Sequence, residues 1–262
     1  MMTLKQKLDY HYKAFGKSQL SPDPLQFLHL YDDEKDIEAV GFLASIFAYG
    51  NVKQIVNTLN KVLSLTENHP YDFIINFNWR EKENHLGNIK HRFYTAEDIT
   101  VLFRLMNEIY MQYGSIKNLF LKFYNRNEPH IKNVLNGFSN ELLQTAKNNS
   151  RRKKITHGIK FMFPLPEHGS ACKRMNLFLR WMVRKDDLDF GIWGDKISKE
   201  KLIIPVDTHV ARICKSLKLT TLENVSWKMA EEITFNLKKF DREDPVKYDF
   251  AICHIGMRKL KF

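Results

Sequence analysis

The stretch FPLPEHGSACKRMNLFL, residues 163–179, combines a proline-marked turn, a Gly-Ser pair and an apolar helix. Ser170 is a favoured helix N-cap residue, so we expect the helix to start directly after it. The backbone N–H groups of Cys172 and Lys173 would then point out of the helix end, where they can bind a phosphate. We expect a lowered pKa for Lys173, because the positive helix end and Arg174 disfavour its protonated form. This stretch therefore predicts a nucleophilic lysine amine.

A second stretch, LIIPVDTHVARI at residues 202–213, brings an aspartate to the start of another helix. Asp207 follows an apolar run and a proline, and aspartate is a common N-cap residue. The polar cluster of Asp207, Thr208 and His209, with Arg212 one turn later, goes beyond what a cap requires. Two roles for Asp207 are therefore open, a structural cap and a functional carboxylate, and they can coexist.

Helical spacing of apolar residues dominates the rest of the chain. Residues 37–47 predict a buried helix, and residues 52–65 predict an amphipathic one. Further helical patterns lie near residues 97–112, 130–146, 171–184, 208–217, 226–239 and 245–256. No alternating series of the kind that predicts strands competes with them. The predicted fold class is all-α.

Length and composition narrow the class of protein. A chain of 262 residues forms one large domain or two small lobes. Its first residues lack the apolar run of a signal peptide, and no stretch is apolar enough for a membrane span. The three cysteines form no CxxC pair, which disfavours a disulfide framework, a zinc site or an iron–sulfur cluster. We expect a cytoplasmic protein without a cofactor.

The positive charge is concentrated in one segment. The whole chain carries a net charge of +11. Residues 147–185 hold 11 Lys and Arg against a single acid, Glu167, so this segment accounts for +10. A solvated surface normally mixes charges of both signs, so the segment favours a polyanionic partner such as nucleic acid. A basic surface without a partner stays possible, and a membrane surface is disfavoured because no long amphipathic helix carries the charge.

Four blocks of the sequence resemble those of one enzyme family. The segment VDTHVAR, residues 206–212, resembles the aspartate motif of endonuclease III and its helix-hairpin-helix DNA glycosylase relatives. Residues 169–176, GSACKRMN, are similar to the second half of their hairpin, which carries the Schiff-base lysine. Residues 42–52, FLASIFAYGNV, resemble the first conserved helix of the family, and residues 248–256, YDFAICHIG, resemble its closing helix. The four blocks occur in the order that the family has.

The resemblance implies a two-lobed helix-hairpin-helix DNA glycosylase fold formed by residues 1–262. The crossing between lobes would lie near 145–160, the hairpin-containing catalytic region at 161–220 and the closing helices at 226–256. Such a protein would act as a monomer on double-stranded DNA that contains a damaged base. The iron–sulfur tail of endonuclease III is absent, so no cluster is expected.

The resemblance also implies roles for individual residues. Lys173 would be the nucleophile, and an ionised Asp207 would stabilise the positive charge that develops on the sugar. Asn51 would fill the gap left by a flipped base. The other residues expected at the DNA are His168, Gly169, Ser170, Arg174, His209 and Arg212. The residues expected to recognise the base are Asp249, Phe250 and Cys253.

The sequence departs from the family pattern in two places, and the second of them bears on the predicted substrate. Ala171 stands where the second hairpin glycine is usual, and 34 residues separate Lys173 from Asp207. This spacing is longer than in endonuclease III and closer to archaeal 8-oxoguanine DNA glycosylases, so we expect residues 186–201 to loop out. The predicted activity is excision of 8-oxoguanine together with lyase activity at the abasic site. The alternatives are a monofunctional glycosylase for alkylated bases, in which Lys173 binds only phosphate, and a non-catalytic helix-hairpin-helix nucleic-acid-binding protein.

Overall fold

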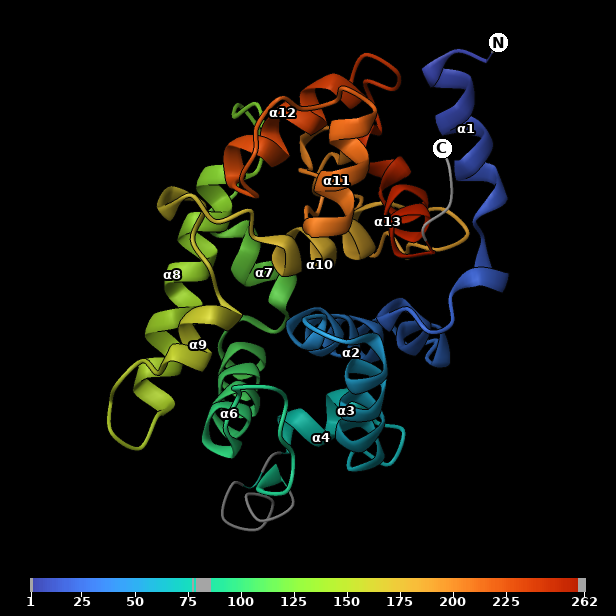
Figure 1. Ribbon diagram of the computed structural model, residues 1–262. Coiled ribbons are helices and arrows are strands. Elements are labelled where there is room, and N and C mark those ends of the chain that lie inside the picture. The colour runs from blue at the N-terminus through green and yellow to red at the C-terminus, as the bar shows by residue number, and fades with distance from the viewer. Residues whose placement is uncertain (1, 77, 79–85, 259–262) are drawn as a thin grey trace. The chain divides into compact units, whose positions relative to one another are not determined.

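The computed structural model describes residues 2–76, 78 and 86–258, and this part of the chain is helical (Figure 1). It contains no strand within these ranges, only two isolated β-bridges. The predicted all-α class is therefore confirmed. The chain divides into two compact units. Unit 1 comprises Met1–Leu20, Asn127–Lys132 and Pro166–Phe262, and unit 2 comprises Ser21–Arg126 and Asn133–Leu165.

Unit 2 is built around a helix that is buried on all sides. Its α-helices are α2 (Glu34–Phe47), α3 (Val52–Ser64), α4 (Pro70–Ile75), α6 (Ala96–Tyr113), α7 (Ile116–Leu121), α8 (Lys132–Asn149) and α9 (His157–Met162), and a 3-10 helix η2 (Pro24–Leu30) precedes them. Asp33 caps α2 by accepting the N–H groups of Lys35 and Asp36. All residues from Ile37 to Phe47 are buried, and α2 packs against η2, α3 and α4. The helices predicted at 37–47 and 52–65 are thus confirmed.

Unit 1 contains the two stretches with which the sequence analysis began. Its elements are α1 (Leu4–Ala14), η1 (Lys17–Gln19), η3 (Pro166–His168), α10 (Lys173–Val183), η4 (Lys199–Lys201), α11 (Thr208–Ser216), α12 (Trp227–Leu237), η5 (Pro245–Tyr248) and α13 (Asp249–Arg258). In Figure 1, α13 lies between α1 and α11, and it packs against both. A Cβ atom at Gly256 would lie 3.2 Å from the Cβ of His209, so this glycine permits the close approach of α13 and α11.

The segment after α10 differs from the sequence prediction. We expected residues 186–201 to loop out, but the segment packs back onto α10. The backbone N–H of Phe190 donates to the carbonyl of Trp181, and that of Trp193 donates to Met182, at 3.0 and 2.7 Å. The Trp193 ring is 1% exposed and lies edge-on to Phe178 at 5.1 Å. The expectation was wrong because burial of the large Trp193 ring favours a packed segment over a solvated loop.

Two further findings concern the chain as a whole. No helix in the described ranges is long and apolar enough to cross a membrane. The last passage of the chain from unit 2 to unit 1 falls between Leu165 and Pro166. That units 1 and 2 are the two lobes of a glycosylase, with a crossing near 145–160, stays a prediction.

Candidate active site

The structure brings Lys173 and Asp207 together, although 34 residues separate them in the sequence. Lys173 is the first residue of α10, and Asp207 directly precedes α11. The Lys173 Nζ atom lies 2.9 Å from Asp207 Oδ2. The two side chains are 32% and 20% exposed, so the pair is accessible from solvent. A lysine side chain and a carboxylate thus meet at the beginnings of two helices.

Asp207 holds this position through its cap. Its Oδ1 atom accepts the backbone N–H groups of His209 and Val210, both at 2.9 Å, and this leaves Oδ2 for Lys173. Burial acts to raise the pKa of the Asp207 carboxyl, but the charge and hydrogen bond of Lys173 outweigh burial and leave the pKa below its ordinary value. Asp207 is therefore ionised at neutral pH. The two roles that the sequence left open, cap and charged carboxylate, coexist in the geometry.

The protonation of Lys173 differs from the expectation of a lowered pKa. Burial acts to lower the pKa of the Lys173 amine, as does a helix N-terminus. The negative charge of Asp207 and its hydrogen bond act in the opposite direction, with a smaller contribution from Asp249, and they prevail, so the pKa is raised above its ordinary value. The prediction was wrong because these groups are distant in the sequence. In the free protein Lys173 is an ammonium ion, and it must lose a proton before it can act as a nucleophile.

The turn that leads into α10 also differs from the expected cap at Ser170. The helix begins at Lys173, and the preceding residue, Cys172, has a left-handed backbone with φ +48° and makes no side-chain cap. The Ser170 Oγ atom instead accepts the N–H of Cys172 at 3.2 Å within the turn. Gly169 also has a positive φ, +81°, which glycine adopts without strain. The first turn of α10 is therefore reached through two left-handed residues rather than a serine cap.

The residues expected at the DNA do not share one environment. His168, Gly169, His209 and Arg212 are exposed, and Ser170 is half-buried. The Nη2 atom of Arg212 donates to the carbonyl of Gly256 at 2.6 Å, so this arginine also ties α11 to α13. Arg174 is only 6% exposed, which removes it from the surface where a phosphate would bind. The placement of Arg174 among the DNA contacts is therefore corrected. Asn51 belongs to unit 2, where it caps α3 by accepting the N–H of Lys53.

Asp249, the predicted base-recognition residue, lies in the interior of unit 1 rather than on a surface. It is 2% exposed, and its Oδ2 atom is ion-paired with Nη1 of Arg180. Its Oδ1 atom is buried and has no hydrogen-bond partner among the described residues. Burial raises the pKa of the Asp249 carboxyl to about 6 against the opposing charge of Arg180. Asp249 thus has one carboxylate oxygen without a hydrogen-bond partner among the described residues, and its pKa of about 6 lies close to neutral pH.

The other two expected base-recognition residues flank Asp249 on α13. Phe250 is 5% exposed, and its ring lies 4.0 Å from the His254 ring and 6.0 Å from the Arg180 guanidinium. Phe250 is therefore a packing residue in this structure, with no open face for a base. Cys253 is a partly exposed free cysteine that lies near Lys173.

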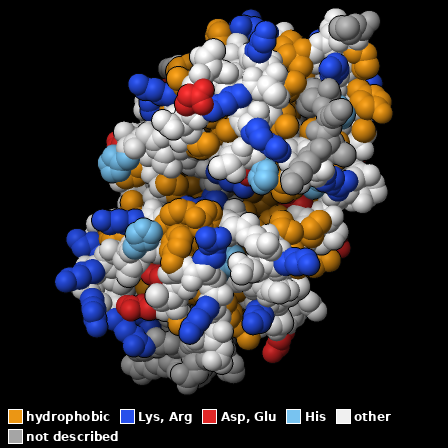
Figure 2. Space-filling view, viewed as in Figure 1, with side chains coloured by type: hydrophobic (Ala, Val, Ile, Leu, Met, Phe, Trp, Pro, Cys, Tyr) orange, Lys and Arg blue, Asp and Glu red, His pale blue; other side chains and the backbone are white. Residues whose placement is uncertain are grey.

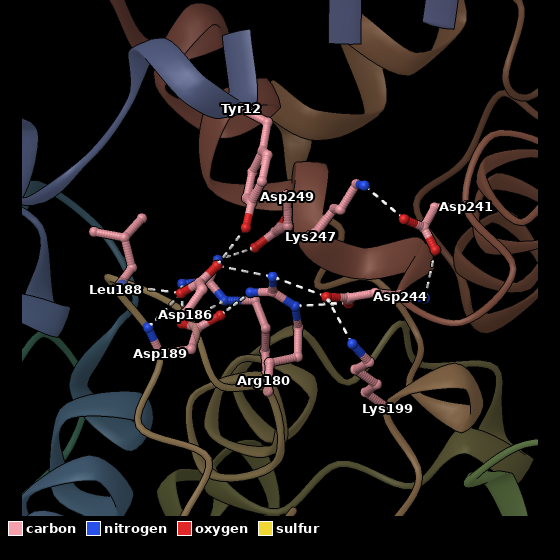
Figure 3. Close-up of polar contacts among 11 residues, drawn as sticks. Tyr12, Arg180, Asp186, Leu188, Asp189, Lys199, Asp241, Asp244, Lys247 and Asp249 are labelled. Carbon is pink, nitrogen blue, oxygen red and sulfur yellow. Dashed lines mark hydrogen bonds and ion pairs between the residues drawn. The ribbon is translucent and has the colours of Figure 1, made fainter. Parts of the chain in front are cut away.

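A buried ion-pair network that the sequence analysis missed holds Asp249 in place (Figure 3). Arg180 of α10 donates from Nε to Asp189 Oδ1 at 3.2 Å, in addition to its pair with Asp249. Arg184, which directly follows α10, binds Asp244 at 2.7 Å, Asp186 at 2.9 Å and Asp189. The network therefore links α10, the segment after it and the start of α13. It fixes Asp249 relative to the helix that carries Lys173.

Acidic groups outnumber basic ones in this network. Arg180 and Arg184 are 3% exposed, and they face four aspartates: Asp186, Asp189, Asp244 and Asp249. Burial raises the pKa of Asp189 as well as that of Asp249. A sequence signal for the network does exist, because two arginines four residues apart interrupt the apolar helix at 180 and 184. The sequence does not show which carboxylates they bind.

Part of the basic segment detected in the sequence is a surface loop of unit 2. Residues 151–154, between α8 and α9, are all exposed. Figure 2 shows Lys and Arg side chains spread over the visible face, with few Asp and Glu side chains among them. The described residues contain no group of three or more His, Cys, Asp or Glu that could hold a metal ion.

Comparison with known proteins places the chain in a family. Residues 23–258 match a family whose description is "Protein of unknown function (DUF2400)", and this chain belongs to that family. No curated protein and no solved structure matches the chain.

Proposed function

We propose that this protein is a helix-hairpin-helix DNA glycosylase that excises a damaged base through Lys173 and Asp207 and then cleaves the abasic site. The observation that carries the proposal is the 2.9 Å pair of Lys173 and Asp207, partly exposed at the starts of α10 and α11. An amine beside an ionised carboxylate matches the needs of this reaction, which passes through a positively charged sugar. As a DNA repair enzyme, it would act in the cytoplasm on chromosomal DNA.

The raised pKa of Lys173 suggests how the reaction starts. The Lys173 ammonium gives one proton to the departing base as the bond between the base and C1′ breaks, and the base takes the bonding electron pair. The negative charge of Asp207 stabilises the sugar cation that remains. The neutral amine then attacks C1′, and its second proton passes to Asp207 or water. The C1′–O4′ bond then breaks as the nitrogen lone pair forms the C=N bond of a Schiff base, and O4′ takes up a proton from Asp207 or water. A proton of C2′ passes to Asp207 or water, and the C3′–O bond breaks, so that the 3′-phosphate leaves with the bonding electron pair. Before the base is reached, it must leave the DNA stack, at a cost of a few kcal/mol.

The contact between Lys173 and Asp207 also bears on the alternative functions. In a monofunctional glycosylase or a non-catalytic binding protein, Lys173 would serve only to bind phosphate. A carboxylate 2.9 Å from the amine would repel that phosphate, and a non-catalytic binding protein gains nothing from it. A monofunctional glycosylase would still use Asp207 to stabilise the sugar cation, but it has no use for an amine held against that carboxylate. The pair therefore disfavours the binding protein through Asp207 and the monofunctional enzyme through the placement of Lys173.

The substrate proposal draws on the sequence spacing and on Asp249. The sequence spacing favours 8-oxoguanine, and the free Oδ1 of Asp249 is a suitable acceptor for the N–H groups of a guanine-type base. Asp249 is buried and paired with Arg180, so a base reaches it only if α13 shifts. We therefore propose 8-oxoguanine as the first substrate to test.

A panel of damaged duplexes tests the proposal. Single-turnover excision is measured on duplexes with 8-oxoguanine, uracil, thymine glycol or an alkylated adenine, using the wild type, Lys173→Gln and Lys185→Gln. Lys185 is an exposed lysine just beyond α10 and serves as the matched control. We expect excision of at least one base by the wild type and Lys185→Gln, and none by Lys173→Gln. Equal activity of all three proteins, or no activity on any duplex, would contradict the proposal.

A further inference from the structure

Unit 2 carries an open pocket of about 660 Å³ that has no role in the proposed reaction. Its described lining consists of Gln54, Asn57, Thr58, Lys61, Lys90, His91, Arg92 and Phe93. The volume falls in the range of small-molecule and cofactor sites, roughly 300–1,000 Å³. The pocket is large enough for a nucleotide.

One wall of the pocket is the polar face of α3. Residues 54, 57, 58 and 61 follow the spacing i, i+3, i+4 and i+7, so they share one side of this helix. The opposite side, with Ile55, Leu59 and Val62, is buried in the core of unit 2. Packing therefore holds α3 in place and leaves the amides of Gln54 and Asn57 available to a ligand.

The other wall, residues 90–93, is held against α3 by a buried histidine. The His91 ring is 2% exposed. Its Nδ1 atom lies 2.9 Å from Thr58 Oγ1, and its Nε2 atom lies 3.0 Å from the carbonyl of Tyr49. Both ring nitrogens are thus engaged, which fixes the neighbouring residues 92 and 93. The pocket is formed before any ligand arrives.

Positive side chains gather in the described lining of the pocket. Lys61, Lys90 and Arg92 are exposed, and within the described residues no ion pair to them occurs and no Asp or Glu lines the pocket. Arg92 has a left-handed backbone with φ +54°, a conformation that costs a residue other than glycine about 1–3 kcal/mol. Its guanidinium lies 4.8 Å from the centre of the Tyr49 ring. Strain of this kind is often retained at binding sites.

An aromatic ring completes the pocket. Phe93 is 37% exposed, although its ring also packs edge-on against Phe161 at 4.7 Å. A partly exposed ring that aromatic neighbours hold in place is a suitable platform for stacking a nucleobase. Charge for a phosphate, amides for base edges and an aromatic platform therefore occur together.

We propose that this pocket binds a nucleoside phosphate. Lys61, Lys90 and Arg92 bind the phosphate, Phe93 stacks on the base, and Gln54 and Asn57 contact the base edge. The ligand is either an unpaired nucleotide within a nucleic-acid strand or a free nucleotide, since the recognised chemistry is the same. The proposal does not depend on the reaction at Lys173, because none of these residues belongs to the candidate active site.

Photo-crosslinking tests the location of binding. A single-stranded oligonucleotide of five nucleotides that contains 5-iodouracil is mixed with the full-length protein and irradiated, and the crosslinked residue is identified by mass spectrometry. We expect an adduct at Phe93 in both the wild type and Lys173→Gln. Retention in Lys173→Gln shows that the pocket acts separately from the proposed chemistry. Adducts confined to other segments, such as 147–185, would overturn the proposal. Competition by a mononucleotide at similar concentration would identify a free nucleotide as the ligand, and competition by oligonucleotides alone would identify a strand.

Two variants test the phosphate contacts by fluorescence anisotropy of the same oligonucleotide. Arg92→Gly removes the guanidinium and places glycine at a left-handed position, so the fold should not lose stability from the backbone. Lys61→Ala removes a second charge. Each should weaken binding about tenfold, as for loss of a charged hydrogen bond. The matched control is Lys53→Ala, an exposed lysine of α3 outside the pocket lining, for which we expect less than about a twofold change. Equal affinities for all four proteins would overturn the proposal.

Discussion

Replacement of Asp207 by Asn separates the charge of this side chain from its capping role. The Asn oxygen can still accept the N–H groups of His209 and Val210, which lie 2.9 Å from Oδ1. What is lost is the ion pair with Lys173, whose partners are 32% and 20% exposed. Pairs with this exposure contribute about 0–1 kcal/mol. We therefore expect the free energy of unfolding to fall by less than about 1 kcal/mol, and the Tm to fall by at most about 4 °C.

The effect on catalysis should be far larger. Without the carboxylate charge, the sugar cation loses its main stabilisation, and we expect base excision to slow by about 10³-fold, or about 4 kcal/mol. The same substitution removes a major cause of the raised pKa of Lys173, so its amine is more often neutral. At a preformed abasic site the base is already missing, so the reaction requires only a neutral amine. We expect that reaction to survive in Asp207→Asn.

Three measurements on wild type, Asp207→Asn and Asp207→Ala check this prediction. They are single-turnover excision on a duplex that the wild type cleaves, Schiff-base formation on an abasic duplex, and thermal unfolding followed by circular dichroism. Asp207→Ala also removes the cap and should lose about 1 kcal/mol more stability than Asp207→Asn. Wild-type excision by Asp207→Asn would refute the electrostatic role. An unfolded Asp207→Asn protein would show that the side chain is mainly structural.

Three further predictions concern the surroundings of the site. Arg180→Ala removes the guanidinium that pairs with Asp249, and urea unfolding should show a loss of stability of about 3–5 kcal/mol. A loss below about 1 kcal/mol would contradict a structural role for the network. Because the folded pKa of Asp249 is raised from 3.8 to about 6, the unfolded state releases this proton first, so stability should fall as the pH rises between these values. Asp249→Asn should remove that part of the slope, and an unchanged slope would assign it to other groups. Reversal of the exposed basic residues 151–154 to glutamate should flatten the salt dependence of DNA binding, and an unchanged slope would show that this loop does not contact the DNA.

The sequence predicted the features that depend on local order. Apolar spacing identified α2, α3 and the longer helices after them, but not the short helices α4, α7 and α9, because an amphipathic pattern needs several turns of neighbouring residues. The cap at Asp207 was predictable for the same reason, since its hydrogen bonds reach only three residues along the chain. The resemblance of four short blocks to a known family singled out Lys173, and the structure places it against Asp207.

The sequence did not predict the features that depend on distant partners. Arg180 binds Asp249, which is 69 residues away, and no local pattern connects the two. Carboxylates from α13 and from the start of α11 raise the pKa of Lys173. Their negative charge outweighs the positive end of α10, which alone would lower that pKa and which was the effect expected from the sequence. The turn before α10 was missed for a different, local reason, because the left-handed backbone of Cys172 replaces the expected serine cap.

Borohydride trapping of the protein on damaged duplex DNA tests the central claim most directly, because only a Schiff base is reduced to a stable adduct. The trapped complex is digested and the modified peptide identified by mass spectrometry. The account predicts a DNA adduct on Lys173, its loss in Lys173→Gln with only modestly weaker duplex binding, and its retention in Lys185→Gln. An adduct on another amine, or no adduct from wild-type protein that binds the duplex, would contradict it.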